Sequence, residues 1–567
     1  MKQTCHTASP PLSASAWIIT LAFLCVPLCA HCVENPVAEG ARERAQLDPV
    51  AYVEAHLAVG ERAVVVPRGD YRLALPEGRT AYFRLIGLAD VTIDFSGSRL
   101  WGETKTRMFD IAHCTNLVVR NVTIDYPFDL PFTQAEIVEV DAEKNWRVKV
   151  VPGYPCPDEV QLAARIWPVQ AYSADGERIV NPMRFRDGIR IERLGPDEYR
   201  ISGGIDRRGE VGDIAVWSVA ETWRKTVIAA IGSRGCSGSL FENLTVHSTP
   251  FGCGFVEFDA DGNIYRNCRL DRCPPEDDPV PRAMKRLRSG NHDAFNSRGA
   301  FRGPTLDGCR LAWHCDDCVN ISGFYVLVLG REGRALRVSP LASELPIDPG
   351  DTCQIQTPDG GCPPDATVVS CSPDGEPTAE EKAFVATLPF WPGARDSWFR
   401  KAFRVELDEE AALPPGSVII SNRRQGNGFV VRKCDFGPNR ARALQIKASD
   451  GLIENNRMRG LEMAAIDVTS EPVPFMEGGC SRNVAIVGND IEGCGGGIVV
   501  SGVTPDGAPL AAGAHRDIRI AGNRVVSPAP ALKVVGCTGL VVEDNDFRTT
   551  DNGKAVEFVN SPTSLLR

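Results

Sequence analysis

The sequence predicts an all-β chain that folds as a right-handed parallel β-helix with two small β-barrel or sandwich domains inserted into it. Three observations predict this fold. Short runs of Val, Ile and Leu recur about every 22 to 25 residues, each run meets a turn residue such as Asn or Gly, and two gaps of roughly a hundred residues interrupt the series. Each coil of such a helix stacks on the previous coil and buries its inward-facing residues.

Residues 1–30 have the features of a secretory signal peptide. Lys2 precedes an apolar run of about 15 residues that ends at Ala30, whereas a membrane span needs about 20. Cleavage after Ala30 or after Ala38 fits the pattern, and nearby cysteines leave a lipoprotein anchor as an alternative. We therefore expect a secreted or periplasmic protein. No second stretch of the sequence approaches membrane-spanning length.

The repeat predicts where the coils of the helix lie. Its phrase combines alternating apolar residues with a turn residue, which stands at ten positions: Asp90, Asn121, Asn243, Asn267, Gly308, Lys433, Asn455, Gly488, Gly522 and Asp544. A short helix is expected over 47–60, followed by coils over 47–125, 233–323 and 428–567. The Asn residues at the turn should stack in a ladder, because Asn tolerates left-handed backbone dihedrals and bonds neighbouring backbone groups.

The two gaps in the repeat, 126–232 and 324–427, contain alternating runs of their own. Arg147–Val151 and Tyr325–Leu329 are typical of antiparallel strands, so each gap is expected to fold as a small barrel or sandwich. The second insertion leaves the coil directly after Asp316 and Asp317. It is therefore well placed to form a wall beside these residues.

Net charge and composition limit the kinds of partner that the protein is expected to bind. The formal net charge of -11 opposes binding to nucleic acid, and the only dense basic run, 282–288, is expected to be a solvated surface loop. The 20 cysteines favour either disulfides, as in many exported proteins, or thiols stacked in the helix core. The sequence leaves the oligomeric state and the disulfide pattern open.

Three acidic side chains carry the predicted chemistry. Asp293 and Asp317 are 24 residues apart, about one coil, so they should lie on neighbouring strands about 4.8 Å apart with Asp316 beside them. Repulsion within the group should raise at least one pKa and leave one carboxyl protonated near neutral pH. Glycoside hydrolysis needs such an acid together with a carboxylate that activates water. A calcium site or solvated coil corners are the alternatives, and no metal or cofactor is expected.

The segments Asn291–Asp293 and Asp316–Ile321 resemble the paired acidic motifs of polygalacturonases and, more fully, of the family 110 α-1,3-galactosidases. The resemblance to the latter spans most of the chain and includes these stretches: Ile124–Tyr126, Leu130–Gln134, Ser248–Phe255, Arg302–Pro304, Arg440–Lys447 and Met476–Gly479. It implies a β-helix with two inserted barrels. It also implies that Asp316 is the general acid, that Asp293 and Asp317 position and deprotonate water, and that terminal α-1,3-linked galactose leaves with inversion.

Eight further side chains are candidate contacts to a carbohydrate substrate: His292, Trp313, His314, Arg440, Arg442, Lys447, Glu471 and Glu477. Arg, Lys and Glu can bond sugar hydroxyls, and Trp can stack on a pyranose face. Each has an alternative structural role. The cations could lie solvated on the outer face of a strand, and the histidines could occupy ladder or loop positions. The tryptophan could pack in the core.

Two other functions fit parts of the pattern. A polysaccharide lyase or pectinase-like enzyme would need a basic cleft and a catalytic Lys or Arg, for which Lys447 is the candidate. A non-catalytic carbohydrate-binding β-helix would keep its sugar affinity after substitution of Asp293 or Asp317.

Overall fold

The computed structural model describes residues 47–158, 162, 169–181, 189–203, 208–219, 229–390, 398–502, 504 and 508–566. The expected signal peptide, residues 1–30, lies outside this range. Strands make up most of the regular structure, and the described helices are α1 (Pro49–Ala58), α3 (Ala379–Thr387) and the short 3-10 helix η2 (Pro275–Asp277). None of the helices within these ranges is long and apolar enough to cross a membrane.

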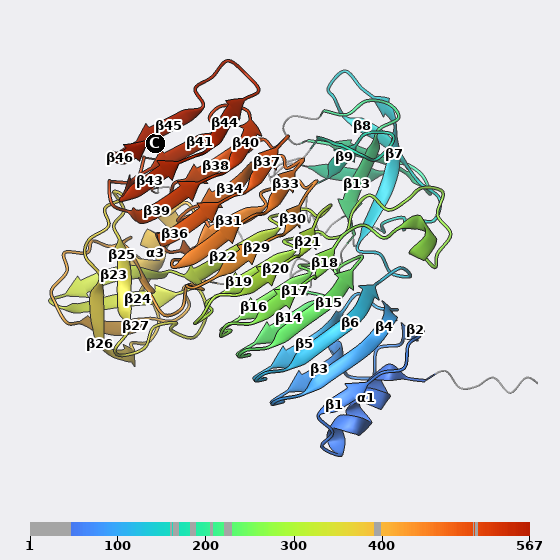
Figure 1. The fold of residues 1–567 in the computed structure, drawn as a ribbon, viewed down its shortest axis with the longest axis horizontal. Helices are drawn as coiled ribbons and strands as arrows, with labels where there is room; N and C mark the ends of the chain where they lie inside the picture. The colour runs from blue at the N-terminus through green and yellow to red at the C-terminus, as the bar shows by residue number, and fades with distance from the viewer. Residues whose placement is uncertain are drawn as a thin grey trace, which may run out of the picture. The chain divides into compact units, whose positions relative to one another are not determined.

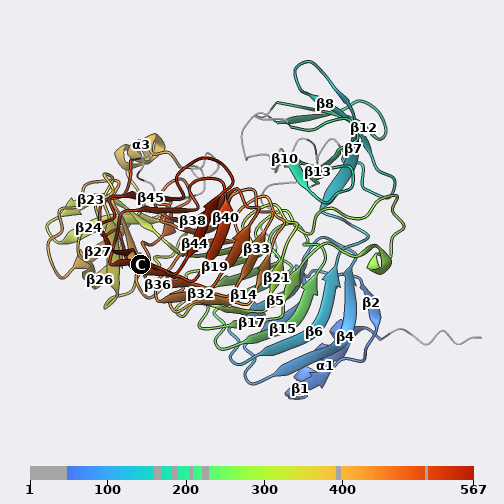
Figure 2. The same cartoon turned by 45° about the horizontal axis from the view of Figure 1, so that its top comes forward.

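Two sheets form the walls of a parallel β-helix, whose strands stack in succession from α1 to β46 (Figures 1 and 2). The larger sheet has 21 strands. They are β1 (Ala63–Val65), β2 (Asp70–Leu73), β4 (Thr92–Gly102), β6 (Val118–Asp125), β15 (Leu240–Val246), β17 (Ile264–Arg266), β18 (Arg269–Leu270), β20 (Thr305–Asp307), β21 (Arg310–Leu311), β29 (Val430–Arg432), β30 (Asp435–Phe436), β32 (Gly451–Glu454), β33 (Arg457–Arg459), β36 (Arg482–Val487), β37 (Asp490–Glu492), β39 (His515–Ala521), β40 (Arg524–Ser527), β42 (Cys537–Thr538), β43 (Leu540–Glu543), β44 (Asp546–Thr549) and β46 (Thr563–Leu566).

The second wall is a 12-stranded sheet that carries the candidate site. Its strands are β3 (Ala81–Ile86), β5 (Arg107–Ala112), β14 (Ile231–Arg234), β16 (Phe255–Phe258), β19 (Phe295–Arg298), β22 (Val319–Phe324), β31 (Leu444–Lys447), β34 (Ala464–Val468), β35 (Glu477–Gly478), β38 (Gly496–Val500), β41 (Leu532–Val535) and β45 (Val556–Val559). Only β35 is antiparallel to its partner, β22. A continuous apolar core runs between the two walls from Val50 to Val542. The predicted fold class is thus confirmed.

The turn residues that define the repeat all have left-handed backbone dihedrals, with φ between 52° and 68°. Strand register places nine of them at one equivalent position, from Asn121 on β6 to Asp544 after β43. Asp90 is the exception. The register between β4 and β6 aligns it with Asn116 instead of Asn121. The turn Asn residues stack as expected, but the bonds join side chain to side chain instead of side chain to backbone: Asn243 Nδ2 donates to Asn121 Oδ1 at 2.9 Å, and Asn267 continues the series.

The cysteines at the turns are buried thiols within the core. Cys268, Cys309 and Cys434 follow equivalent turn residues on successive coils, and each sulfur contacts a backbone carbonyl oxygen of a neighbouring strand. All three side chains are at most 2% exposed. The sequence left two alternatives for the cysteines, disulfides or stacked thiols. These three cysteines are stacked thiols.

The first insertion is a seven-stranded antiparallel sheet in the order β10, β9, β13, β7, β8, β12, β11. In the described residues it takes the form of an open sheet rather than a barrel. Its strands are β7 (Phe132–Val140), β8 (Trp146–Val150), β9 (Gln170–Tyr172), β10 (Ile179–Asn181), β11 (Arg190–Arg193), β12 (Glu198–Ser202) and β13 (Ile214–Ser218).

The second insertion is a closed six-stranded barrel. It leaves the helix directly after β22 and returns at β29. Its strands are β23 (Val326–Glu332), β24 (Ala335–Pro340), β25 (Thr352–Gln356), β26 (Ala366–Pro373), β27 (Phe403–Leu407) and β28 (Val418–Ser421). The barrel has a core of its own, which includes Val328, Val338 and Val405.

The basic run 282–288 is not the solvated loop that the sequence predicted. Arg286 is fully buried and its guanidinium binds both carboxylate oxygens of Asp125 at 2.6 and 2.8 Å, with Asp278 as a third partner at 2.9 Å. Burial alone would raise the pKa of Asp125, but the charge and hydrogen bonds of Arg286, together with His247 and Ser248, outweigh it and lower the pKa. The prediction failed because Asp125 and Arg286 are far apart in the sequence, so their pairing left no local signal.

Candidate functional site

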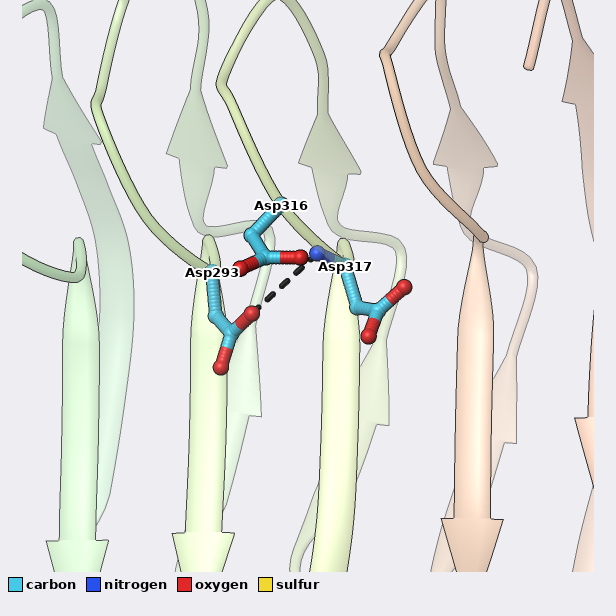
Figure 3. Close-up of side chains that lie close together, drawn as sticks. All are labelled: Asp293, Asp316 and Asp317. Atoms are coloured by element: carbon cyan, nitrogen blue, oxygen red, sulfur yellow. Dashed lines mark hydrogen bonds between the residues drawn. The ribbon is translucent and has the colours of Figure 1, made fainter. Parts of the chain in front are cut away.

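Asp293 and Asp317 stand two residues before β19 and β22, at equivalent places on neighbouring coils (Figure 3). The backbone N–H of Asp317 donates to Asp293 Oδ1 at 3.1 Å, and the backbone N–H of Ala294 donates to the carbonyl of Asp317 at 3.0 Å. The 24-residue spacing in the sequence therefore corresponds to one coil, as predicted. The same register places Cys253 on the preceding coil and Arg442 on the following coil in line with the two aspartates.

Asp316 lies on the turn that enters β22, and its side chain leans over the space between the other two carboxylates (Figure 3). One carboxylate oxygen from each of the three residues lies within 4.8 Å of the others. The Asp316 side chain is 23% exposed, whereas that of Asp317 is 5% exposed. Asp316 is thus the member of the group that a bound substrate would meet first.

The environment of the group changes its titration. Burial raises the pKa of Asp316 to about 6, against the opposing charge of Arg440 and with a further contribution from Asp317. Burial, together with the charges of Asp316 and Asp317, raises the pKa of Asp293 well above its ordinary value. The sequence predicted raised pKa values from repulsion among three neighbouring aspartates, and burial is the larger cause in the structure.

Two arginines of the next coil reach the group. Arg440 Nη2 donates to Asp316 Oδ1 at 2.7 Å. Arg442 approaches Asp317 through its backbone N–H at 3.0 Å and its guanidinium at 3.4 Å, while its Nε binds Asp467 Oδ2 at 2.8 Å. Both predicted arginines therefore contact the candidate catalytic carboxylates, although 125 residues separate Arg442 from Asp317 in the chain.

A loop carrying Glu471 and Glu477 folds back over β22 and β31. The two glutamates exchange backbone hydrogen bonds at 2.9 Å, and β35 pairs with the end of β22. Lys447 is completely buried between their carboxylates, at 2.6 Å from Glu477 Oε2 and 3.1 Å from Glu471 Oε2. A Cβ atom at Gly478 would lie 2.2 Å from the Tyr325 ring, so this close approach of the loop requires glycine.

Glu477 contacts several side chains around this loop. Arg298 donates to its Oε1 at 2.6 Å, and Asn320 Nδ2 lies 3.3 Å from Oε2. Burial alone would raise the pKa of Glu477, but the charges of Lys447 and Arg298 outweigh it and lower the pKa to about 2. One ion cluster thus joins Glu471, Glu477 and Lys447, all of which were predicted as substrate contacts.

A ladder of polar side chains on the outward face of the same strands was missed by the sequence analysis. Register aligns Asn296, Asn320, Gln445 and Asp467 on four successive coils. Each one bonds a charged group already described: Asn296 donates to Asp293 at 2.5 Å, and Gln445 donates to Glu471 at 3.1 Å. The signal that could have identified them was a polar residue directly after each of the aligned apolar residues Phe295, Val319, Leu444 and Ile466.

Two buried oxygens of this ladder accept no hydrogen bond from the described residues, Asn320 Oδ1 and Asp467 Oδ1. The amide orientation of Asn320 follows from its Nδ2, which faces Glu477. Buried acceptors usually have a donor, so these two atoms are places where a hydroxyl group or a water molecule would bind.

Three predicted substrate contacts lie next to the aspartates in the sequence but have different surroundings in the structure: His292, Trp313 and His314. His314 is fully buried, its Nδ1 lies 3.1 Å from the His292 carbonyl, and burial lowers its pKa to about 3. Burial likewise lowers the pKa of His292 to about 4, with a further effect of Arg298. Trp313 packs in the core of the first insertion and stacks against Arg272, whose guanidinium carbon lies 3.7 Å from the ring centroid.

The first insertion also holds the segment that leads into Asp293. Arg288 is completely buried and donates to Gln170 Oε1 at 2.7 Å, to the Val216 carbonyl at 3.0 Å and to Asn291 Oδ1 at 3.1 Å. Asn291 Nδ2 in turn donates to the carbonyl of Pro131 at 3.0 Å. The position of Asp293 thus depends on residues of the inserted sheet.

Three carboxylates at this spacing are ligands that a hard cation such as Ca²⁺ accepts. Two of the three already face a guanidinium, Asp316 that of Arg440 and Asp317 that of Arg442. Because these cations neutralise the carboxylates, the group is better arranged for proton transfer than for holding a metal ion.

No family model matches the chain, and no curated protein matches it. Several solved structures align over most of it at low identity. The endo-xylogalacturonan hydrolase of Aspergillus tubingensis is 10% identical, with a TM-score of 0.39 over 94% of this chain and 96% of that chain. The family 28 exopolygalacturonase of Yersinia enterocolitica is 11% identical, with a TM-score of 0.33 over 88% of this chain and 72% of that chain. A mannuronan C-5 epimerase A-module of Azotobacter vinelandii is 10% identical, with a TM-score of 0.32 over 91% and 92%.

Proposed function

We propose that the protein is an exported glycoside hydrolase that removes terminal α-1,3-linked galactose from oligosaccharides or glycoconjugates with inversion. One observation carries the proposal of glycoside hydrolysis: three carboxylates lie within 4.8 Å of one another, and the most exposed of them, Asp316, has a pKa of about 6. A carboxyl group with this pKa can donate a proton near neutral pH. The choice of galactose and of the linkage rests on the motif resemblance.

In the proposed reaction Asp316 donates its proton to the glycosidic oxygen as the bond to the anomeric carbon breaks. Asp317 accepts a proton from water, and Asp293 holds that water through its carboxyl group. The water oxygen forms the new bond to the anomeric carbon. Arg442 Nη1 lies 3.4 Å from Asp317 Oδ1, whereas burial and the neighbouring carboxylates raise the pKa of Asp293.

The separation of the carboxyl groups bears on the stereochemical outcome. Inverting enzymes keep acid and base about 6.5 to 9.5 Å apart, and retaining enzymes about 5 to 5.5 Å apart. The closest oxygens of the three aspartates lie within 4.8 Å, which by itself is nearer the retaining range. Inversion is therefore proposed from the motif resemblance, and the configuration of the first product decides it.

The loop of Glu471 and Glu477 supports action at a chain end. It lies over the ends of β22 and β31 and is fixed there by the buried Lys447, so a glycan cannot continue in that direction along the strand face. Asn320 Oδ1 and Asp467 Oδ1, which accept no hydrogen bond within the described part of the chain, are the proposed partners for hydroxyl groups of the terminal sugar. A hydroxyl group can donate to each of them.

The ion pairs of the site weigh against a polysaccharide lyase or pectinase-like enzyme. Lys447, the candidate base for a lyase, is buried between two carboxylates, whose charges outweigh burial and raise its pKa, so it retains its proton. Each of the four cations at the site is paired with one or more of its six carboxyl groups, which disfavours binding of uronates. These groups are Asp293, Asp316, Asp317, Asp467, Glu471 and Glu477, with Arg298, Arg440, Arg442 and Lys447.

The proposal is tested by incubating the protein with α-1,3-galactobiose, B-antigen trisaccharide and polygalacturonate, and following the products by proton NMR. Release of β-galactose first supports the full proposal, whereas initial α-galactose keeps the hydrolase and overturns inversion. An unsaturated, ultraviolet-absorbing product from polygalacturonate supports a lyase instead. Sugar binding that persists without turnover, also after Asp317→Ala, supports a non-catalytic binding protein. Asp490→Asn, at a surface carboxylate that is 44% exposed, is the matched control and should leave all rates unchanged.

A further inference from the structure

We propose that Cys362 and Cys480 form a disulfide bond that ties the inserted barrel to the loop carrying Glu471 and Glu477. Cys362 lies in the connection between β25 and β26 of the barrel, and Cys480 lies two residues after β35. Their sulfur atoms are 3.9 Å apart, although 118 residues separate them in the chain. This inference does not depend on the reaction that the site performs.

The surroundings of the two thiols hold them in this position. Asp365, three residues after Cys362, binds both terminal nitrogens of Arg482, two residues after Cys480, at 2.6 Å each. Leu510 packs against the pair from a later coil. Rotation of the side chains must bring the sulfurs from 3.9 Å to the bonding distance of about 2 Å, while the ion pair fixes the backbones on either side.

Access and charge favour oxidation at this pair. Cys362 is partly exposed, whereas the core cysteines Cys268, Cys309 and Cys434 are at most 2% exposed. Contact with the Cys480 thiol, and then the charges of Arg482 and Arg516, lower the pKa of Cys362 below its ordinary value. A thiolate that an oxidant can reach is the species that begins thiol–disulfide exchange.

The reaction requires a disulfide oxidant, either a small molecule or an oxidoreductase. The Cys362 thiolate attacks one sulfur of the oxidant and releases its other half as a thiol. The Cys480 thiolate then attacks the sulfur of Cys362 in the mixed disulfide and releases the second thiol. The protein loses two electrons and two protons, and the oxidant disulfide becomes two thiols.

The test uses the full chain, reduced and then treated with oxidised glutathione, alkylated, and digested without reductant for mass spectrometry. We expect a cross-linked peptide pair containing Cys362 and Cys480, which disappears in Cys362→Ser. Cys371→Ser, at another partly exposed thiol of the barrel, should retain the cross-link. Alkylation of both Cys362 and Cys480 after oxidation, or pairing of Cys362 with a different cysteine, would overturn the proposal.

A second measurement tests whether the bond acts as a tether. A cross-link that closes a loop of 118 residues should raise the Tm of the oxidised protein by about 4 °C over the reduced protein. The increase should be absent in Cys362→Ser. A cross-link that forms but leaves the Tm unchanged would show that the two parts are not held together by it.

Discussion

Replacing Glu477 by Gln tests the ion cluster that fixes the loop over the site, and it needs no substrate. The pKa of Glu477 lies at about 2 in the folded protein, compared with an ordinary value of 4.5. This difference corresponds to about 3 kcal/mol of folding free energy at neutral pH. Because unfolding of roughly 500 residues has a large entropy, the expected loss of Tm at pH 7 is only about 3 °C.

The dependence on pH distinguishes this charge effect from a packing effect. The folded pKa of Glu477 is depressed, so its contribution is complete above pH 4.5 and is lost as the pH falls from about 4.5 to about 2. At pH 3 the difference between the wild-type protein and Glu477→Gln should therefore fall to about 1.4 kcal/mol.

The assay is thermal unfolding followed by tryptophan fluorescence at pH 7 and pH 3. Glu332→Gln is the matched control, since Glu332 is 82% exposed and its pair with Arg404 at 3.1 Å should contribute less than about 1 kcal/mol. An equal loss of Tm at both pH values, or no loss at pH 7, would refute the reasoning about Glu477.

Three further predictions concern the aspartates and their supports. Asp316→Asn should lower kcat on α-1,3-galactobiose by about 10²- to 10⁴-fold and spare aryl galactosides with good leaving groups, as measured by galactose release. The alkaline limb of kcat should lie near pH 6, and Arg440→Gln should move it upward by about one pH unit, because the guanidinium lowers the pKa of Asp316. Arg288→Met should cost about 1–3 kcal/mol in urea unfolding, since it removes buried hydrogen bonds from the charged guanidinium to Gln170 Oε1 and to the Val216 carbonyl.

Periodicity was sufficient to predict the helix and the meeting of Asp293 with Asp317. A repeat of one coil converts sequence spacing into spatial contact, so these two residues needed no long-range information. The pairing of Arg442 with Asp317 follows the same register, but the barrel insertion hides it by adding a hundred residues to the spacing. The sequence identified Arg442 only as a candidate contact to a carbohydrate substrate.

The sequence could not predict which charged side chains are buried. Arg286 looked like a surface residue because its partners, Asp125 and Asp278, come from different elements. Lys447 likewise looked available as a base, whereas two glutamates of a folded-back loop enclose it. In each case the environment depends on how an insertion or loop packs, and local residue patterns do not encode that packing.

The register that joins Arg442 to Asp317 also sets an order of events during synthesis. At a rate of about 5–20 residues per second, Arg442 leaves the ribosome roughly 6–25 seconds after Asp317, because the whole barrel is made in between. During that interval β22 is the open edge of the growing helix, and its two aspartates lack their arginine partners. A nascent chain that stops within the barrel therefore exposes an unpaired parallel edge beside uncompensated carboxylates, and its site is assembled only when β31 is added.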